Sequence, residues 1–197
     1  MNKHQLIPPQ VRGKEVNISR QKTLTGVAAA HVAFQQSSQR LLHPQKWKEL
    51  AGGGSSFEVL DHQLKQVERE VAEGDYLRID VPGPGPGSGN GFDWVRVELV
   101  ESSGAHLGIK LRPCANPEEK QEQAAHFFDE ASSSTLMIGL ENCTLTASYH
   151  GRNETPNNKT GHIVENIRNT LVATGAMTGL SELQWDKLLQ GLLDGDS

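Results

Sequence analysis

The chain contains only two cysteines, Cys114 and Cys143, which are too few for a disulfide framework and too widely separated for a recognisable metal site. We therefore expect two reduced thiols. The sequence also lacks any run of about 18 apolar residues, which argues against a membrane-spanning helix. The polar residues Met1 to Lys22 lack the apolar core of a secretory signal. These absences predict a soluble cytoplasmic protein without membrane association.

Positive charge is scarce too. The chain has 19 Lys and Arg against 24 Asp and Glu, which gives a formal net charge of -5. A duplex-binding domain usually presents a strongly basic surface, so we do not expect a nucleic-acid partner. The hydrophobic share of 36% and the charged share of 22% are typical of a folded globular protein rather than a disordered one.

Motifs for metals and cofactors are missing as well. The sequence contains no His-x-His, His-Glu-x-x-His or Cys-x-x-Cys motif. The glycine-rich segment Pro82–Gly91 contains prolines that remove the N–H donors a phosphate cradle needs, and a strand pattern rather than a helix follows it. We therefore predict no metal and no cofactor, and we interpret this segment as a surface hairpin connection.

What the chain does have is a series of short segments that alternate apolar and polar residues. In one of them Leu77 and Ile79 point to one side of a strand while Arg78 and Asp80 point to the other. This period of two predicts an α+β fold with a curved antiparallel sheet or small barrel of about five or six strands, whose other face is charged. The predicted strands are Phe57–Leu60, Tyr76–Val81, Trp94–Val100, Leu107–Arg112, Leu136–Leu140 and Thr144–His150.

Helical patterns flank the strands at both ends of the chain. A stripe of apolar residues predicts a helix over Gln21–Leu42, and Pro44 begins a second short helix. Further helices are predicted over 118–130, 163–177 and 181–195, whereas 62–71 fits either a helix or an irregular edge. Pro8 and Pro9 interrupt any regular element, so we interpret residues 1–20 as a flexible arm and 21–197 as a single domain.

This order of elements loosely resembles that of helix-grip proteins, which hold apolar ligands between a sheet and a helix. The resemblance lies in topology alone, because no strand is predicted before the first helix and no motif supports it. We therefore do not assign the chain to that group on its sequence.

The densest group of functional side chains follows the last predicted strand. His150 could serve as a general base, Glu154 could orient it or act as an acid, Arg152 could bind an anion and Asn153 could stabilise an oxyanion. In the structural alternative, Arg152 ties down a loop through carbonyls while Asn153 and Glu154 brace the following turn. The sequence thus predicts a non-enzymatic binding or assembly module of unknown ligand, with a hydrolase-like enzyme using residues 149–154 as the alternative.

The terminal helices carry more apolar surface than a few short strands need to cover. We therefore expect a homodimer through these helices, since an exposed apolar patch usually marks an interface. The competing explanation is that the helix over 21–42 packs on them and closes the core within one chain. The apolar residues concerned include Leu183, Trp185, Leu188, Leu189, Leu192 and Leu193.

Overall fold

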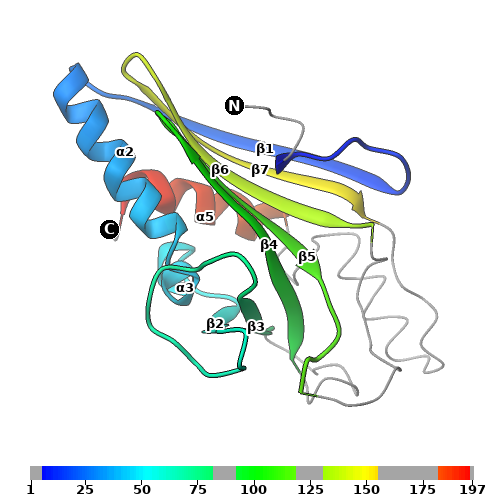
Figure 1. The fold of residues 1–197 in the computed structure, drawn as a ribbon. Helices are drawn as coiled ribbons and strands as arrows, with labels where there is room; N and C mark the ends of the chain where they lie inside the picture. The colour runs from blue at the N-terminus through cyan, green and yellow to red at the C-terminus, as the bar shows by residue number, and fades with distance from the viewer. Residues whose placement is uncertain (1–5, 82–91, 119–130, 155–181, 196–197) are drawn as a thin grey trace.

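The computed structural model describes residues 6–81, 92–118, 131–154 and 182–195. They form one antiparallel sheet with helices packed against one of its faces (Figure 1). We call the face toward the helices the inner face and the opposite one the outer face. None of the described helices is long and apolar enough to span a membrane.

The sheet has seven strands in the order β1-β7-β6-β5-β4-β3-β2, so all strands after β1 follow one another as a meander. Every neighbouring pair is antiparallel, as the alternation of apolar and polar residues predicts. The strands are β1 Lys14–Thr23, β2 Ser56–Leu60, β3 Tyr76–Asp80, β4 Asp93–Ser103, β5 His106–Pro113, β6 Ser133–Glu141 and β7 Thr144–Glu154.

The interpretation of residues 1–20 as a flexible arm is wrong for residues 14–20, which belong to β1. This strand pairs with β7 along its length, and Figure 1 shows the two side by side although they are far apart in the sequence. The strand lacks a full apolar stripe because several of its inward positions meet acidic residues instead of the core. Lys14, Arg20 and Lys22 form ion pairs with a helix at the other end of the chain.

That partner is helix α5, Glu182–Asp194, which lies across β1 and β7. The other helices are α2 Val27–Leu41, η1 Pro44–Lys46 and α3 Trp47–Leu50. Helix α2 begins six residues later than predicted, at Val27 rather than Gln21, because residues 21–23 complete β1. It packs on β6 and on α5, and α3 packs on α5 and β2. The short helix that Pro44 begins and the last helix are confirmed.

The core lies between the inner face and these helices. Trp47 of α3 meets Phe57 of β2 edge to face, and Trp185 of α5 stacks on Tyr149 of β7. Helix α5 approaches α3 so closely that a side chain at Gly191 would overlap the carbonyl oxygen of Leu50. The helices and the inner face together bury one continuous apolar cluster.

Helix α5 buries its apolar residues inside the chain, as the competing explanation for the terminal helices requires. Trp185, Leu188, Leu189 and Leu192 are fully buried, whereas Leu183 is 64% exposed. Packing of α2 and α3 on α5 accounts for this burial without a second subunit. The predicted homodimer therefore stays a prediction, and the apolar surface of α5 no longer argues for it.

Residues 62–71 form an irregular edge rather than a helix, which settles the open alternative. A single bridge joins Leu60 to Gln66, and Leu64 has a positive φ of 61°. The charged outer face is also observed, where Glu98 forms ion pairs with Lys110 and Arg112. The helices predicted over 118–130 and 163–177, and the connection 82–91, lie almost wholly outside the described residues.

Candidate functional site

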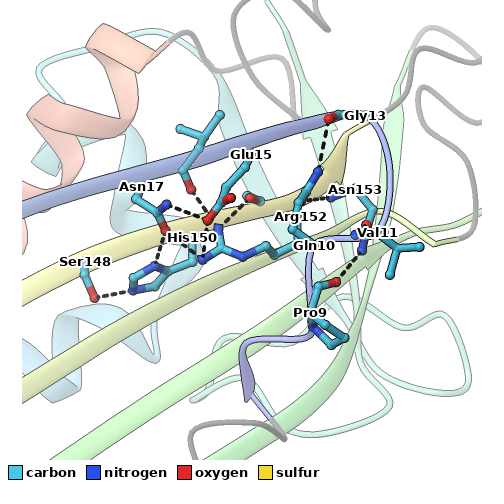
Figure 2. A network of polar contacts seen from close by, with 12 residues as sticks. Pro9, Gln10, Val11, Gly13, Glu15, Asn17, Ser148, His150, Arg152 and Asn153 are labelled. Atoms are coloured by element: carbon cyan, nitrogen blue, oxygen red, sulfur yellow. Dashed lines mark hydrogen bonds and ion pairs between the residues drawn. The ribbon is translucent and has the colours of Figure 1, made fainter.

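The polar residues that follow the last predicted strand continue β7 and extend it to Glu154. Their side chains divide between the two faces of the sheet. Figure 2 shows His150, Arg152 and Asn153 in a network of polar contacts with β1 and with the segment before it. Glu154 lies on the inner face and takes no part in that network.

Arg152 fixes β1 to β7 on the outer face. Its guanidinium donates hydrogen bonds to the carbonyl oxygens of Val16 at 3.1 Å and Gly151 at 2.8 Å, and to Oδ1 of Asn17 at 2.8 Å. It also lies 3.3 Å from the carboxylate of Glu15. These contacts match the structural alternative, in which Arg152 ties down the backbone through carbonyls.

His150 joins the same network beside Arg152. Oδ1 of Asn17 already accepts a hydrogen bond from Arg152, so the contact of 2.8 Å with Nδ1 of His150 requires this nitrogen to donate. Nε2 of His150 lies 3.1 Å from the hydroxyl of Ser148 and can accept its proton. Both ring nitrogens are therefore engaged in hydrogen bonds on the outer face of the sheet.

Asn153 holds an N-terminal strap, which we define as residues 9–13. Its Oδ1 accepts hydrogen bonds from the backbone N–H groups of Val11 at 2.7 Å and Arg12 at 3.2 Å, and its Nδ2 donates to the carbonyl of Pro9 at 3.2 Å. The backbone N–H of Asn153 donates to the side chain of Gln10 at 2.8 Å. Asn153 thus ties the strap to the end of β7.

The backbone conformation of Asn153 also determines the face of the sheet to which the next side chain, Glu154, points. Asn153 has a φ of 55°, in the left-handed region that asparagine tolerates better than most residues. The register between β1 and β7 shifts here: Val16 pairs with Gly151 but Lys14 pairs with Glu154. This bulge places one extra residue on β7 and turns Glu154 to the inner face.

On the inner face, Glu154 completes a group that we call the inner polar cluster: Ser134, Tyr149, Glu154 and Trp185. The hydroxyl of Tyr149 donates to Oε1 of Glu154 at 3.1 Å and lies 2.9 Å from the hydroxyl of Ser134. The rings of Tyr149 and Trp185 stack with centroids 4.3 Å apart and planes at 18°. All of these side chains are buried, and Glu154 is only 2% exposed.

Gly151 makes room for the carboxyl group. It pairs with Ser134 across the sheet and lies between Tyr149 and Glu154. A Cβ at this position would overlap Oε1 of Glu154 and would lie 3.1 Å from the hydroxyl of Tyr149. Only glycine therefore lets the Glu154 carboxyl lie flat against the inner face.

Burial of Glu154 raises the pKa of its carboxyl group to about 7. The hydrogen bond from Tyr149 and the charges of Lys14 and Arg152 oppose this rise, and the charge of Glu182 adds to it. Burial likewise raises the pKa of Tyr149, and the neighbouring Glu154 charge acts in the same direction. Glu154 is therefore a carboxyl group that changes its protonation state near neutral pH, inside an apolar core.

Two buried atoms of the inner polar cluster have unused hydrogen-bonding capacity. Among the described residues, neither Oε2 of Glu154 nor Nε1 of Trp185 has a hydrogen-bond partner. A buried polar atom without a partner costs about 1–3 kcal/mol, so native cores contain few of them. Both atoms belong to side chains that contact Tyr149, and this marks the region around Tyr149 on the inner face as the candidate site.

The structure does not bring the predicted site residues together. His150, Arg152 and Asn153 lie in the outer network, and Glu154 lies on the inner face, so the set required by the hydrolase-like alternative does not converge. Sequence reasoning included Tyr149 in the segment 149–154 without giving it a role, and it missed Ser134 and Trp185. Tyr149 and Gly151 share a face by alternation, but the bulge that adds Glu154 to that face has no signal in the sequence.

The described residues also contain no group of His, Cys, Asp and Glu able to hold a metal ion.

Comparison with solved structures settles the fold. The chain is similar to hypothetical protein jhp0584 from Helicobacter pylori, with a TM-score of 0.59 and 12% identity, over 98% of this chain and 94% of that one. The described elements run from one strand through helices and a six-strand meander to a last helix that packs on the inner face. The chain has a helix-grip fold. Strand β1 supplies the first strand that the sequence did not reveal.

Two solved structures with lower TM-scores are an aromatase/cyclase, ZhuI, from Streptomyces sp. R1128, and a STAR-related lipid transfer protein from Xanthomonas axonopodis. The first has a TM-score of 0.46 and 11% identity over 91% of this chain and 92% of that one. The second has a TM-score of 0.40 and 12% identity over 89% of this chain and 85% of that one. No family model and no curated protein matches the sequence.

Proposed function

We propose that this chain is a binding module for an apolar small molecule, which lies against the inner face of the sheet with its polar end at the inner polar cluster. Helix-grip proteins typically hold apolar ligands between the sheet and the last helix. Away from the inner polar cluster, the inner face carries apolar side chains of the meander, such as Leu77, Val97, Ile109 and Leu111. Such a surface favours apolar ligands through the hydrophobic effect.

The observation that carries the proposal is the buried carboxyl group of Glu154 with one oxygen left over. A residue of this kind destabilises a core that has no use for it, because a buried carboxyl must either remain protonated or find a partner. Leucine or glutamine would fill the same place without a titrating group. A ligand that uses the free oxygen offsets this cost and gives the carboxyl a binding role.

Titration of the protein with the uncharged dye N-phenyl-1-naphthylamine tests the proposal. We expect saturable binding with a stoichiometry of one, accompanied by quenching of tryptophan fluorescence, because Trp185 belongs to the site. Near-UV circular dichroism must stay unchanged, since the dye also binds loosely packed states. Absence of saturable dye binding by the folded protein would contradict the proposed function.

A matched pair of variants locates the bound dye. The chain has two tyrosines, Tyr149 in the inner polar cluster and Tyr76 at the start of β3. We expect Tyr149→Phe to change the affinity for the dye severalfold, because it removes the hydroxyl that holds Glu154 in place. Tyr76→Phe should leave the affinity unchanged. Equal effects of the two variants would mean that the dye binds elsewhere.

A further inference from the structure

The hydrogen bonds of the inner polar cluster run in one direction. When Glu154 is ionised, Tyr149 gives its only hydroxyl proton to Oε1 of Glu154, so Ser134 donates in the 2.9 Å contact between the hydroxyls of Tyr149 and Ser134. The chain of donated hydrogens thus ends on Glu154. In this ionised state, what remains among the described residues is one acceptor, Oε2 of Glu154, and one donor, Nε1–H of Trp185. Both side chains contact Tyr149, so both belong to one small region.

A hydroxyl group is the simplest partner for this combination. It donates one hydrogen bond and can accept two, whereas a carboxylate only accepts and an ammonium only donates. We propose that Glu154 and Trp185 together bind a hydroxyl group of the apolar ligand, so that the site prefers alcohols and phenols to carboxylic acids. This inference rests on the proposed function and names the ligand class.

The charges around the cluster also disfavour an anionic ligand. Among the described residues, two cations influence Glu154: Lys14 of β1 is paired with Glu182 of α5 at 2.6 Å, and Arg152 points to the outer face. From β7 and β6, Tyr149 and Ser134 already spend their hydrogens within the cluster. A ligand carboxylate would therefore face the Glu154 carboxylate with no cation from the described part of the chain between them, and like charges brought together without water repel strongly.

Displacement of the dye by ligands with one shared chain tests the inference. The probes are 1-decanol, decanoate and decylammonium, compared at about pH 6 and about pH 8, on either side of the Glu154 pKa of about 7. At the higher pH we expect 1-decanol to bind about tenfold or more tightly than decanoate, because Glu154 is then ionised. At the lower pH this ratio should shrink, since the protonated carboxyl no longer repels decanoate.

Two variants show whether Glu154 causes this discrimination. Glu154→Gln keeps the shape of the side chain and removes its titration, so the ratio of the two affinities should become independent of pH. Glu141→Gln removes an exposed carboxylate at the opposite end of β6 from Ser134, and it should preserve the pH dependence. Both variants are compared by dye displacement on protein whose fold has been verified by near-UV circular dichroism.

The outcomes separate this inference from the proposed function. Equal displacement by 1-decanol and decanoate at both pH values, or a pH dependence that survives Glu154→Gln, would overturn the hydroxyl preference but leave apolar binding intact. Tightest binding of decylammonium would also overturn it, because the carboxylate would then select a cation. If none of the probes displaces the dye, the proposed function fails together with the inference.

Discussion

At the scale of single residues, Glu154 makes the stability of the protein depend on pH in an unusual direction. The pKa of its carboxyl group is about 7 in the folded chain, whereas the ordinary value of 4.5 applies to the solvated carboxyl of the unfolded chain. Between these values the folded state binds more protons than the unfolded state, so stability falls as the pH rises. A difference of this size corresponds to about 3 kcal/mol of lost stability above neutral pH.

We therefore predict that Glu154→Gln unfolds at a higher urea concentration than the unaltered protein at pH 8, by about 3 kcal/mol in free energy. The two proteins should converge toward pH 4.5, where Glu154 is increasingly protonated in both states. Urea titrations across this pH range measure the difference in unfolding free energy between the two proteins. The contributions of the other titrating groups are the same in both proteins and cancel in this difference. A constant difference at all pH values would show that Glu154 does not titrate as described.

Gly151 supplies a second prediction at this scale. In Gly151→Ala the new methyl group would overlap the carboxyl of Glu154, so the flexible glutamate side chain has to leave the inner face. We expect the pKa of Glu154 to return toward its ordinary range, because burial is the main cause of its rise. Carboxyl carbon shifts in an NMR titration measure this change.

Gly108→Ala is the matched control for that experiment. Gly108 also lies in the sheet, but its added methyl group would meet Leu6, which packs against the outer face. This variant should leave the titration of Glu154 as it is in the unaltered protein. An unchanged Glu154 titration in Gly151→Ala would mean that the carboxyl keeps its place despite the overlap.

At the scale of elements, the strap and the bulge of β7 depend on the same asparagine. Glycine adopts a positive φ readily, so Asn153→Gly keeps the bulge but loses the side-chain hydrogen bonds to Pro9, Val11 and Arg12. We predict a loss of about 1–3 kcal/mol in stability. The backbone N–H groups of Val11 and Arg12 should also lose protection from hydrogen exchange.

Asn142 offers a control with the same backbone conformation. It lies between β6 and β7, and its φ is 55°, as in Asn153. Asn142→Gly should change stability by less than about 0.5 kcal/mol, as is usual for surface positions, and should leave the strap protected. Equal protection of the strap in both variants would contradict the role of Asn153.

The strands show what a sequence can and cannot predict about elements. The meander was predictable because its apolar residues alternate on one face, as Leu77 and Ile79 do. Strand β1 was missed because its inward side chains Lys14, Arg20 and Lys22 are matched to acids of α5 instead of to apolar residues. Pairing between segments this far apart leaves no local pattern in either one.

The candidate site was only partly predictable for the same reason. The sequence singled out Glu154, but it grouped that residue with His150 and Arg152, because consecutive residues were expected to share a loop. Strand alternation and the bulge at Asn153 separate them onto opposite faces. Trp185 joins the cluster only through the packing of α5 on β7, which a single sequence does not encode locally.

At the scale of the whole molecule, α5 closes the core of a single chain. Three exposed ion pairs along the helix join it to β1, and Arg40 of α2 donates to the carbonyl of Leu192 in its last turn. Exposed ion pairs contribute about 0–1 kcal/mol each. The burial of its apolar face therefore holds α5 in place more firmly than these polar contacts do.

This arrangement predicts different results for two leucines of the same helix. Leu189 is fully buried and Leu183 is 64% exposed. Leu189→Glu places an unpaired charge in the core, which costs several kcal/mol, a large part of the roughly 5–15 kcal/mol by which domains are stable. We expect it to abolish cooperative unfolding, whereas Leu183→Glu should shift stability by no more than about 0.5 kcal/mol.

Light scattering on the same proteins tests the homodimer predicted from the sequence. A mass near 21.5 kDa for the unaltered protein would reject the dimer, and about twice that mass would support it. In either case the structure predicts that Leu189→Glu loses its helical circular dichroism signal, because Leu189 contacts the core of its own chain. A folded Leu189→Glu protein whose mass falls from the dimer to 21.5 kDa would instead place Leu189 between subunits and contradict the closure of the core by α5.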